Sequence, residues 1–199
     1  MAEPNVITKQ DLIESAKTCI VKNGVNKLTL KAVAEGAGVT QGTVYYHFKT
    51  KDQLMVEVVS DMCQTSWDRL ERMKKNSDQQ VKEWIQTGLQ SASKRNSSDS
   101  FYHSLFYSLI TASLHNNKIR EQISGLLTYE NQVLEKQIEA VAGKELYGVS
   151  AEVWSVLMNA LIDGLAIQSM MIEDFDANKA FKGLETLLIK QMEDNQPST

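Results

Sequence analysis

Proline and glycine are scarce in this chain, which has 2 Pro and 10 Gly among 199 residues. A strand-rich fold needs a turn every ten residues or so, and turns draw heavily on these two residue types. Apolar residues make up 42% of the chain, which is enough for a packed core. We therefore expect an all-α fold of about nine helices rather than a strand-rich one.

Helix-start signals divide the first fifty residues into three short helices. Thr8, Thr29 and Thr40 each precede a helical segment, and a threonine hydroxyl at this position can accept a backbone N–H of the first turn. Gly24 and Gly38 follow the first and second segments, where a residue with positive φ commonly ends a helix. The predicted helices cover residues 9–22, 30–37 and 41–48.

The rest of the chain is also helical in pattern, and no internal repeat or strand alternation stands out. Thr50 and Gln53 have the spacing of a capping box and predict the start of a fourth, longer helix. Apolar periodicity then predicts five further helices. Their approximate ranges are 79–94, 101–114, 117–142, 150–172 and 176–192.

Charge is distributed unevenly along the chain. The net charge of −4 argues weakly against nucleic-acid binding. Residues 1–52, however, contain seven lysines and five acidic residues, whereas the remainder contains 14 basic and 20 acidic residues. A slightly basic N-terminal part has the sign expected for an anionic partner.

The second and third predicted helices are joined by a very short turn around Gly38, which is helix-turn-helix geometry. Ala34 is small where one helix would cross another. Val39 and Val44 can fill the space between the helices, and Phe48 can close it. This packing would leave the outer face of residues 40–47 free to enter a major groove.

The segment "LTLKAVAEGAGVTQGTVYYHFKTKDQL" resembles the N-terminal domain of the tetracycline-repressor (TetR) family of bacterial regulators. The turn "AGV", the helix "TQGTVYYHF" and the Lys-x-x-Leu start of helix four carry the resemblance, which covers about residues 9–55. The rest is similar in its helical layout, its length and its apolar penultimate helix. The resemblance implies a DNA-binding domain at 1–52 and a helical ligand-binding and dimerisation domain at 53–199.

The resemblance also implies which side chains meet DNA. Gln41 could bond an adenine edge, Thr43 could touch a base or a phosphate, and Gly42 would let the backbone approach closely. The remaining contacts would go to phosphates. One tyrosine could instead pack inward, Thr40 could serve mainly as a cap, and Lys49 could be plain solvated surface. The implied contact residues are Thr29, Lys31, Thr40, Gln41, Gly42, Thr43, Tyr45, Tyr46, His47 and Lys51.

The predicted helix at 150–172 is apolar nearly all round. Asn159, Asp163 and Gln168 interrupt it, so a buried helix of a soluble protein explains it better than a membrane span. One face could pack within its own subunit and the other on a second copy, with a single monomeric core as the alternative. The residues expected at the dimer interface are Trp154, Met158, Leu161, Ile162, Leu165, Phe181, Leu184 and Leu188.

The middle helices are rich in large aromatic residues. Each has core packing as its default role, but together they could line an apolar cavity with a few polar groups. By resemblance this cavity holds a small effector, either hydrophobic or, given the acidic body, cationic. The candidate lining residues are Trp67, Trp84, Tyr102, His103, Phe106, Tyr107, Tyr129 and Gln132.

The resemblance implies a ligand-responsive transcriptional regulator, a repressor that binds a palindromic operator as a homodimer and is released by its effector. The alternative is a DNA-binding structural or segregation factor with no small-molecule ligand. We expect no enzyme, catalytic residue, metal or cofactor, because the sequence has no nucleophile elbow, phosphate-binding glycine loop or Cys/His cluster. Two distant cysteines and a polar start favour the cytoplasm over secretion.

Overall fold

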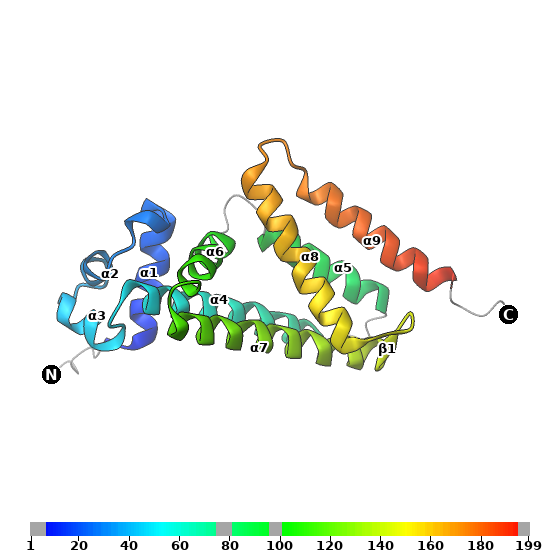
Figure 1. The fold of residues 1–199 in the computed structure, drawn as a ribbon, viewed down its shortest axis with the longest axis horizontal. Coiled ribbons are helices and arrows are strands. Elements are labelled where there is room, and N and C mark those ends of the chain that lie inside the picture. Colours follow the sequence, from blue (N-terminus) through cyan, green and yellow to red (C-terminus); the bar gives the residue numbers. More distant parts are fainter. Residues whose placement is uncertain (1–6, 75–80, 96–100, 195–199) are drawn as a thin grey trace. The chain divides into compact units, whose positions relative to one another are not determined.

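The computed structural model describes residues 7–74, 81–95 and 101–194 (Figure 1). These residues form nine α-helices, one 3-10 turn and one short antiparallel hairpin, so the expected all-α fold is confirmed. The chain divides into two compact units. The first unit comprises residues 1–63 and 104–124, and the second comprises 64–103 and 125–199. The functional boundary expected after residue 52 stays a prediction.

The first unit begins with three short helices that pack on one another. The helices α1 (Lys9–Asn23) and α2 (Leu30–Ala37) are in contact, and α2 also packs on α3 (Gln41–His47). The 3-10 turn η1 (Val25–Lys27) connects α1 to α2. The unit also holds the start of α4 (Lys51–Lys74), most of α6 (Tyr102–Ser113) and the start of α7 (Asn117–Ala142). Its fully buried side chains include Leu12, Leu28, Val33, Val44, Phe48, Leu54, Val58 and Val59.

Threonine caps start these helices as the sequence predicts. The Thr8 hydroxyl accepts the Asp11 backbone N–H, and Asp11 in turn accepts the Thr8 backbone N–H at 2.8 Å, which completes a capping box. The Thr8 hydroxyl also donates to the Asp11 carboxylate at 2.7 Å, and this hydrogen bond together with that from the Thr8 backbone lowers the pKa of Asp11. The hydroxyls of Thr29, Thr40 and Thr50 accept N–H groups at 3.0, 3.3 and 3.1 Å. Each cap satisfies a donor that the first helical turn leaves without a partner.

The turn between α2 and α3 depends on a left-handed glycine. Gly38 has φ 67° and ψ 30°, a conformation in which a Cβ atom is strained. The next residue, Val39, donates its backbone N–H to the Ala34 carbonyl at 2.9 Å and so closes the end of α2. Val44 and Phe48 are both fully buried beneath α3. The helix-turn-helix packing expected from the sequence is therefore present.

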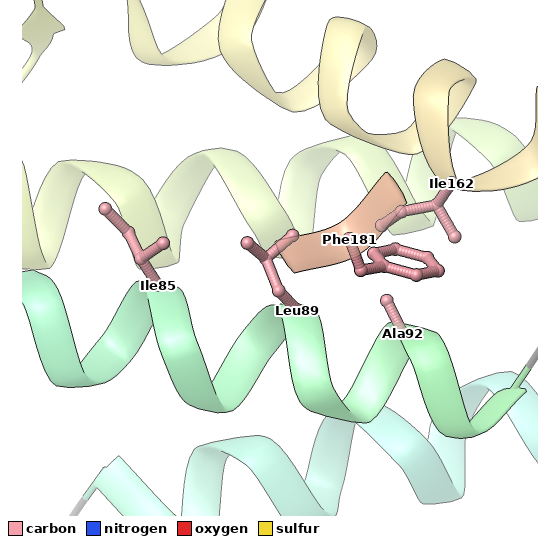
Figure 2. Packing of buried hydrophobic residues seen from close by; sticks show 5 residues of the cluster. All are labelled: Ile85, Leu89, Ala92, Ile162 and Phe181. Carbon is pink, nitrogen blue, oxygen red and sulfur yellow. The ribbon is translucent and has the colours of Figure 1, made fainter. Parts of the chain in front are cut away.

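The second unit has its own apolar core. The helices α5 (Val81–Arg95), α8 (Ala151–Met171) and α9 (Ala177–Asp194) contribute a buried cluster in which α9 packs on α5 and α8 (Figure 2). The Phe181 ring lies between Ala92 and Ile162 in this view. Two side-chain hydrogen bonds, Gln86 to Glu185 at 2.7 Å and Ser93 to Asn178 at 2.6 Å, also join α5 to α9. The buried members of the cluster are Ile85, Leu89, Ala92, Ile162 and Phe181.

This core changes the interpretation of several apolar residues. Ile162 and Phe181 are expected at a dimer interface from the sequence, but both are buried inside their own chain and offer no surface to a partner. Helical periodicity identifies an apolar face but does not say what covers it. Four other expected interface residues are partly buried and pack against the same cluster. These are Met158, Leu165, Leu184 and Leu188.

A hairpin between α7 and α8 was not predicted from the sequence. Its strands β1 (Glu145–Leu146) and β2 (Val149–Ser150) are only two residues long, too short for an alternating pattern. Tyr147 and Gly148 form the two-residue loop, with φ 56° and 74°, as mirror-image hairpin turns require. The hairpin is anchored by Trp154, which donates to the Leu146 carbonyl at 2.7 Å, and by Tyr147, whose hydroxyl donates to the Leu188 carbonyl at 2.9 Å.

Candidate nucleic-acid interface

The short helix α3 has one buried side and one exposed side. Val44 fixes it to the core of the first unit. Gln41, Gly42, Tyr45 and Tyr46 are exposed, and Tyr46 is 74% exposed. Large aromatic side chains that gather on a polar helix face suggest a surface that binds another molecule. Neither tyrosine packs inward, so that alternative is wrong.

The three threonines near α3 already have intramolecular roles. Thr29 and Thr40 are the N-caps of α2 and α3. Thr43 is half-buried, and its hydroxyl oxygen lies 3.1 Å from that of Thr40. A hydroxyl that accepts one hydrogen bond can still donate another. Capping by Thr29 and Thr40 is thus compatible with a phosphate contact, which stays a prediction.

Gly42 is a glycine that the chain itself does not require. It lies in α3 without a positive φ, and a Cβ built on it would meet only the Thr40 hydroxyl at 3.6 Å, an ordinary contact. Glycine in a helix costs roughly 0.5–1 kcal/mol relative to alanine. Neither the backbone conformation nor the surrounding space requires glycine at position 42. Its small size instead fits a surface that another molecule, such as a DNA backbone, approaches closely.

Aromatic and basic groups form one continuous cluster at the end of α3. The Lys49 ammonium lies 5.1 Å from the ring centroid of Tyr45 and 5.4 Å from that of Tyr46, which is cation–π distance. The His47 ring contacts Tyr46 edge to face at 5.2 Å and is half-buried. We call Tyr45, Tyr46 and Lys49 the aromatic–lysine cluster. Lys49 follows the end of α3, beyond its non-helical C-cap Phe48, so helical spacing in the sequence does not identify this contact.

The two other lysines expected at DNA differ in environment. Lys31 is exposed and forms a long ion pair with Glu35 at 3.8 Å. Lys51 is half-buried, and its ammonium donates to the Val25 carbonyl at 3.4 Å, a long hydrogen bond that links the start of α4 to η1. Lys51 therefore contributes to the structure of the first unit in a way that the sequence did not indicate.

The aromatic residues proposed for a ligand cavity do not share one environment. Trp67, Tyr102 and His103 are buried in the second unit, where Trp84 packs partly against the α5–α8–α9 cluster. Phe106 and Tyr107 belong to the first unit. Tyr129 and Gln132 are exposed. The cavity assignment stays a prediction, and Tyr129 and Gln132 fit it least.

Polar groups are buried inside the second unit. The Tyr102 hydroxyl donates to Glu130 at 3.2 Å, and His103 lies 3.5 Å from the Asp163 carboxylate. Two further buried donors, the indole N–H of Trp67 and the side-chain amide of Gln137, have no hydrogen-bond partner in the part of the chain that the structure describes. A buried donor without a partner costs roughly 1–3 kcal/mol and calls for an explanation.

The surface of α8 opposite its buried side is apolar. Ser155, Ile162 and Ala166 are buried on one side, whereas Val153, Leu157 and Met171 recur at helical spacing on the other. Leu157 is 52% exposed. Among the described helices, α8 is also the one long and apolar enough to cross a membrane, which is weak evidence by itself. The exposed apolar side chains are Val153, Val156, Leu157, Leu161, Ile167, Met170 and Met171 on α8, and Leu187 on α9.

Together these features define an all-α protein with an N-terminal helix-turn-helix domain and a helical body. Residues 12–58 match the family model described as "Bacterial regulatory proteins, tetR family". The similarity to this family is therefore shown for this N-terminal segment, which is about a quarter of the chain. Within residues 7–74, 81–95 and 101–194, no group of three or more His, Cys, Asp or Glu side chains could hold a metal ion.

Known proteins resemble the chain at two levels. The HTH-type transcriptional regulator TtgR of Pseudomonas putida is 38% identical over 72 residues, which cover 36% of this chain and 34% of TtgR. The matched segment thus spans about a third of this relative. Two solved structures share the fold over nearly the whole chain. A TetR transcription regulator from Haloarcula marismortui has a TM-score of 0.69 at 14% identity, covering 90% of this chain and 94% of the other. The regulator FadR from Bacillus subtilis, in complex with stearoyl-CoA, has a TM-score of 0.62 at 19% identity, covering 92% and 99%.

Proposed function

We propose that this protein is a ligand-responsive transcriptional regulator, a repressor that binds a palindromic DNA operator as a homodimer and is released by a small effector. The observation that carries this proposal is the exposed side of α3, where Gln41, Gly42, Tyr45 and Tyr46 lie together. Similarity to the regulator TtgR over 72 residues supports it. The same relative favours a regulator over an enzyme.

DNA recognition would divide between two kinds of contact. Gln41 is exposed in the first turn of α3, from which a helix in the major groove reads base edges. Tyr45, Tyr46 and His47 follow in the next turn and suit phosphate oxygens. Thr29 and Lys31 at the start of α2 would hold the flanking phosphate. This arrangement fits one half-site.

Two such domains would read two half-sites about one helical turn, roughly 34 Å, apart. The exposed apolar side chains of α8 support a second copy as the partner, because an apolar helix face of this size is unfavourable in water. Leu161 and Trp154 would remain near this interface, whereas Ile162 and Phe181 would not. A dimer also accounts for the apolar character of α8 without a membrane, since Asn159 and Asp163 interrupt the helix.

The second unit is the proposed effector site. The buried N–H groups of Trp67 and Gln137 would gain partners from an effector that carries hydrogen-bond acceptors on an apolar body. The effector would have to bind the DNA-free conformation more tightly than the DNA-bound one, because only differential affinity shifts the equilibrium. A segregation or structural DNA-binding factor is the alternative function, and it needs no such ligand.

Operator selection from random duplex DNA tests the proposal. We expect recovery of a two-fold symmetric sequence, with binding weakened at least tenfold when Gln41 is replaced by Ala. Failure to enrich any duplex would contradict the regulator assignment. Cytoplasmic localisation would be checked in the same host by fractionation.

A single-tryptophan variant tests the effector site and separates the two functions. The chain has 3 Trp, at positions 67, 84 and 154. The double variant W84F and W154F leaves Trp67 as the reporter. Acceptor-bearing apolar compounds should change its fluorescence and release the selected duplex. If no class of compound did either, the factor without a ligand would be favoured.

A further inference from the structure

We propose that Lys49, held over the rings of Tyr45 and Tyr46, is the lysine that binds a DNA phosphate beside α3, and that Lys51 instead braces the start of α4. This inference rests on the proposed DNA-binding function and identifies which cation of the surface acts. The sequence pointed to Lys51 and left Lys49 as solvated surface. The contacts in the first unit instead favour Lys49 as the phosphate-binding lysine and Lys51 as a structural one.

The ammonium of Lys49 is held in place by aromatic rings rather than by a carboxylate. It lies within 5.4 Å of both tyrosine centroids, and both rings are more than half exposed. Among the described residues no acidic side chain forms an ion pair with Lys49, whereas Lys9 pairs with Glu57 at 2.6 Å. The charge of Lys49 is therefore not neutralised within the part of the chain that the structure describes.

The rings also limit where this charge can go. A free lysine side chain samples many rotamers, and fixing it costs conformational entropy at the moment of binding. Contact with two adjacent ring faces restricts the ammonium to the exposed end of α3 before a ligand arrives. A phosphate there could accept from Lys49 and from a tyrosine hydroxyl together, since the three side chains are contiguous.

Lys51 has a different geometry. Its ammonium is directed to the Val25 carbonyl of η1 and the residue is half-buried. A lysine that satisfies a backbone carbonyl inside its own domain has to give up that bond to reach a phosphate. Its removal should therefore affect the folding of the first unit more than the electrostatics of binding.

Salt dependence of DNA binding distinguishes the two lysines. Each phosphate neutralised by a protein cation contributes about 0.9 to the slope of log affinity against log salt. For a dimer, K49Q should lower the magnitude of this slope by about 2. The loss of affinity of K49Q relative to wild type should therefore be roughly tenfold larger at 50 mM salt than at 200 mM salt. K51Q should change the slope less than K49Q and lower the melting temperature more.

Matched variants complete the test. K22Q removes an exposed lysine of α1 and should leave the slope unchanged. In a double-mutant cycle, replacing Tyr45 and Tyr46 by Leu should reduce the effect of K49Q, because the rings no longer position the charge. K49R should retain most of the slope.

The outcomes separate this inference from the proposed function. If the wild-type chain binds no selected duplex, the proposed function fails before the variants are compared. If it binds and K49Q keeps the wild-type slope, or K51Q lowers the slope as much as K49Q does, only the assignment of Lys49 is overturned.

Discussion

Lys17 on α1 and Asp61 on α4 form an ion pair inside the first unit, with both side chains only about one-fifth exposed. Gln10 donates to the same carboxylate group at 2.8 Å, and Glu14 accepts from Lys17 at 2.7 Å. Gln10 and Lys17, from different turns of α1, therefore both bind the Asp61 carboxylate of α4. Such partly buried, hydrogen-bonded charges contribute more to stability than surface ion pairs do.

Replacing Asp61 by Asn should destabilise the protein by about 1–2 kcal/mol, because Lys17 loses its main partner while remaining partly buried. Urea unfolding followed by far-UV circular dichroism would measure the change. E35Q is the matched control, since it removes the exposed Lys31–Glu35 pair and should cost less than about 0.5 kcal/mol. Equal effects from the two variants would contradict this prediction.

The same ion pair should make stability depend on pH in the alkaline range. Burial alone would lower the pKa of Lys17, but its hydrogen bonds to Asp61 and Glu14 and their charges raise the pKa above the ordinary 10.5. The folded state therefore binds this proton more tightly than the unfolded state. The contribution is fully present below the ordinary pKa and is lost as pH rises through the folded pKa.

Unfolding free energies of wild type and D61N should accordingly converge as the pH is raised past 10.5. Burial also raises the pKa of Tyr147, but this group is common to both proteins and cancels in the difference. A difference between the two proteins that stayed constant from neutral to strongly alkaline pH would contradict the assignment to Lys17.

Replacing Gly42 by Ala should separate stability from DNA binding. The new methyl group meets only ordinary contacts, so the free energy of unfolding should stay the same or rise by about 0.5–1 kcal/mol. Binding to the selected duplex should fall at least tenfold, because the methyl group holds the DNA backbone away. Anisotropy titration and thermal melting would be measured on the same sample.

Replacing Gly36 by Ala should, unlike G42A, destabilise the protein. A Cβ at this position would lie 2.7 Å from the Ser15 hydroxyl, which itself donates to the Val33 carbonyl at 2.9 Å between α1 and α2. G36A should therefore lower the melting temperature, and any loss of DNA binding should follow from that. If G42A lost stability as G36A does, close approach of DNA would not explain Gly42.

Replacing Leu157 by Glu should convert a dimer to a monomer in sedimentation velocity at micromolar concentration. Leu157 is exposed in the single chain, so the charge should disrupt association without unfolding the subunit. L114E adds the same charge at an exposed leucine just after α6 and should leave the oligomeric state unchanged. A wild-type chain that sediments as a monomer would overturn the proposed interface.

The sequence predicted local features better than it predicted partners. Thr8, Thr29, Thr40 and Thr50 cap helices as expected, because capping depends on residues only three positions apart. Gly38 was identifiable for the same reason. These local signals were enough to define the helix-turn-helix domain and the all-α fold.

Long-range packing could not be predicted in this way. Ile162 and Phe181 lie 19 positions apart and meet across α8 and α9, so apolar periodicity alone could not tell a core from an interface. Lys49 and Lys51 are both lysines near one helix end, yet one contacts aromatic rings and the other a backbone carbonyl. The two residues are of the same type, so only the position of each ammonium group in the folded structure distinguishes them.

The Tyr147–Gly148 turn has a mechanical consequence for the helix that follows α8. The Tyr147 hydroxyl is bound to the Leu188 carbonyl, and Trp154 holds the same hairpin at the start of α8. A slide of α9 by one turn, about 5.4 Å, would carry that carbonyl out of reach. The hairpin thus resists a slide of α9 along its own axis, because a shift of that size requires the bond between Tyr147 and Leu188 to break.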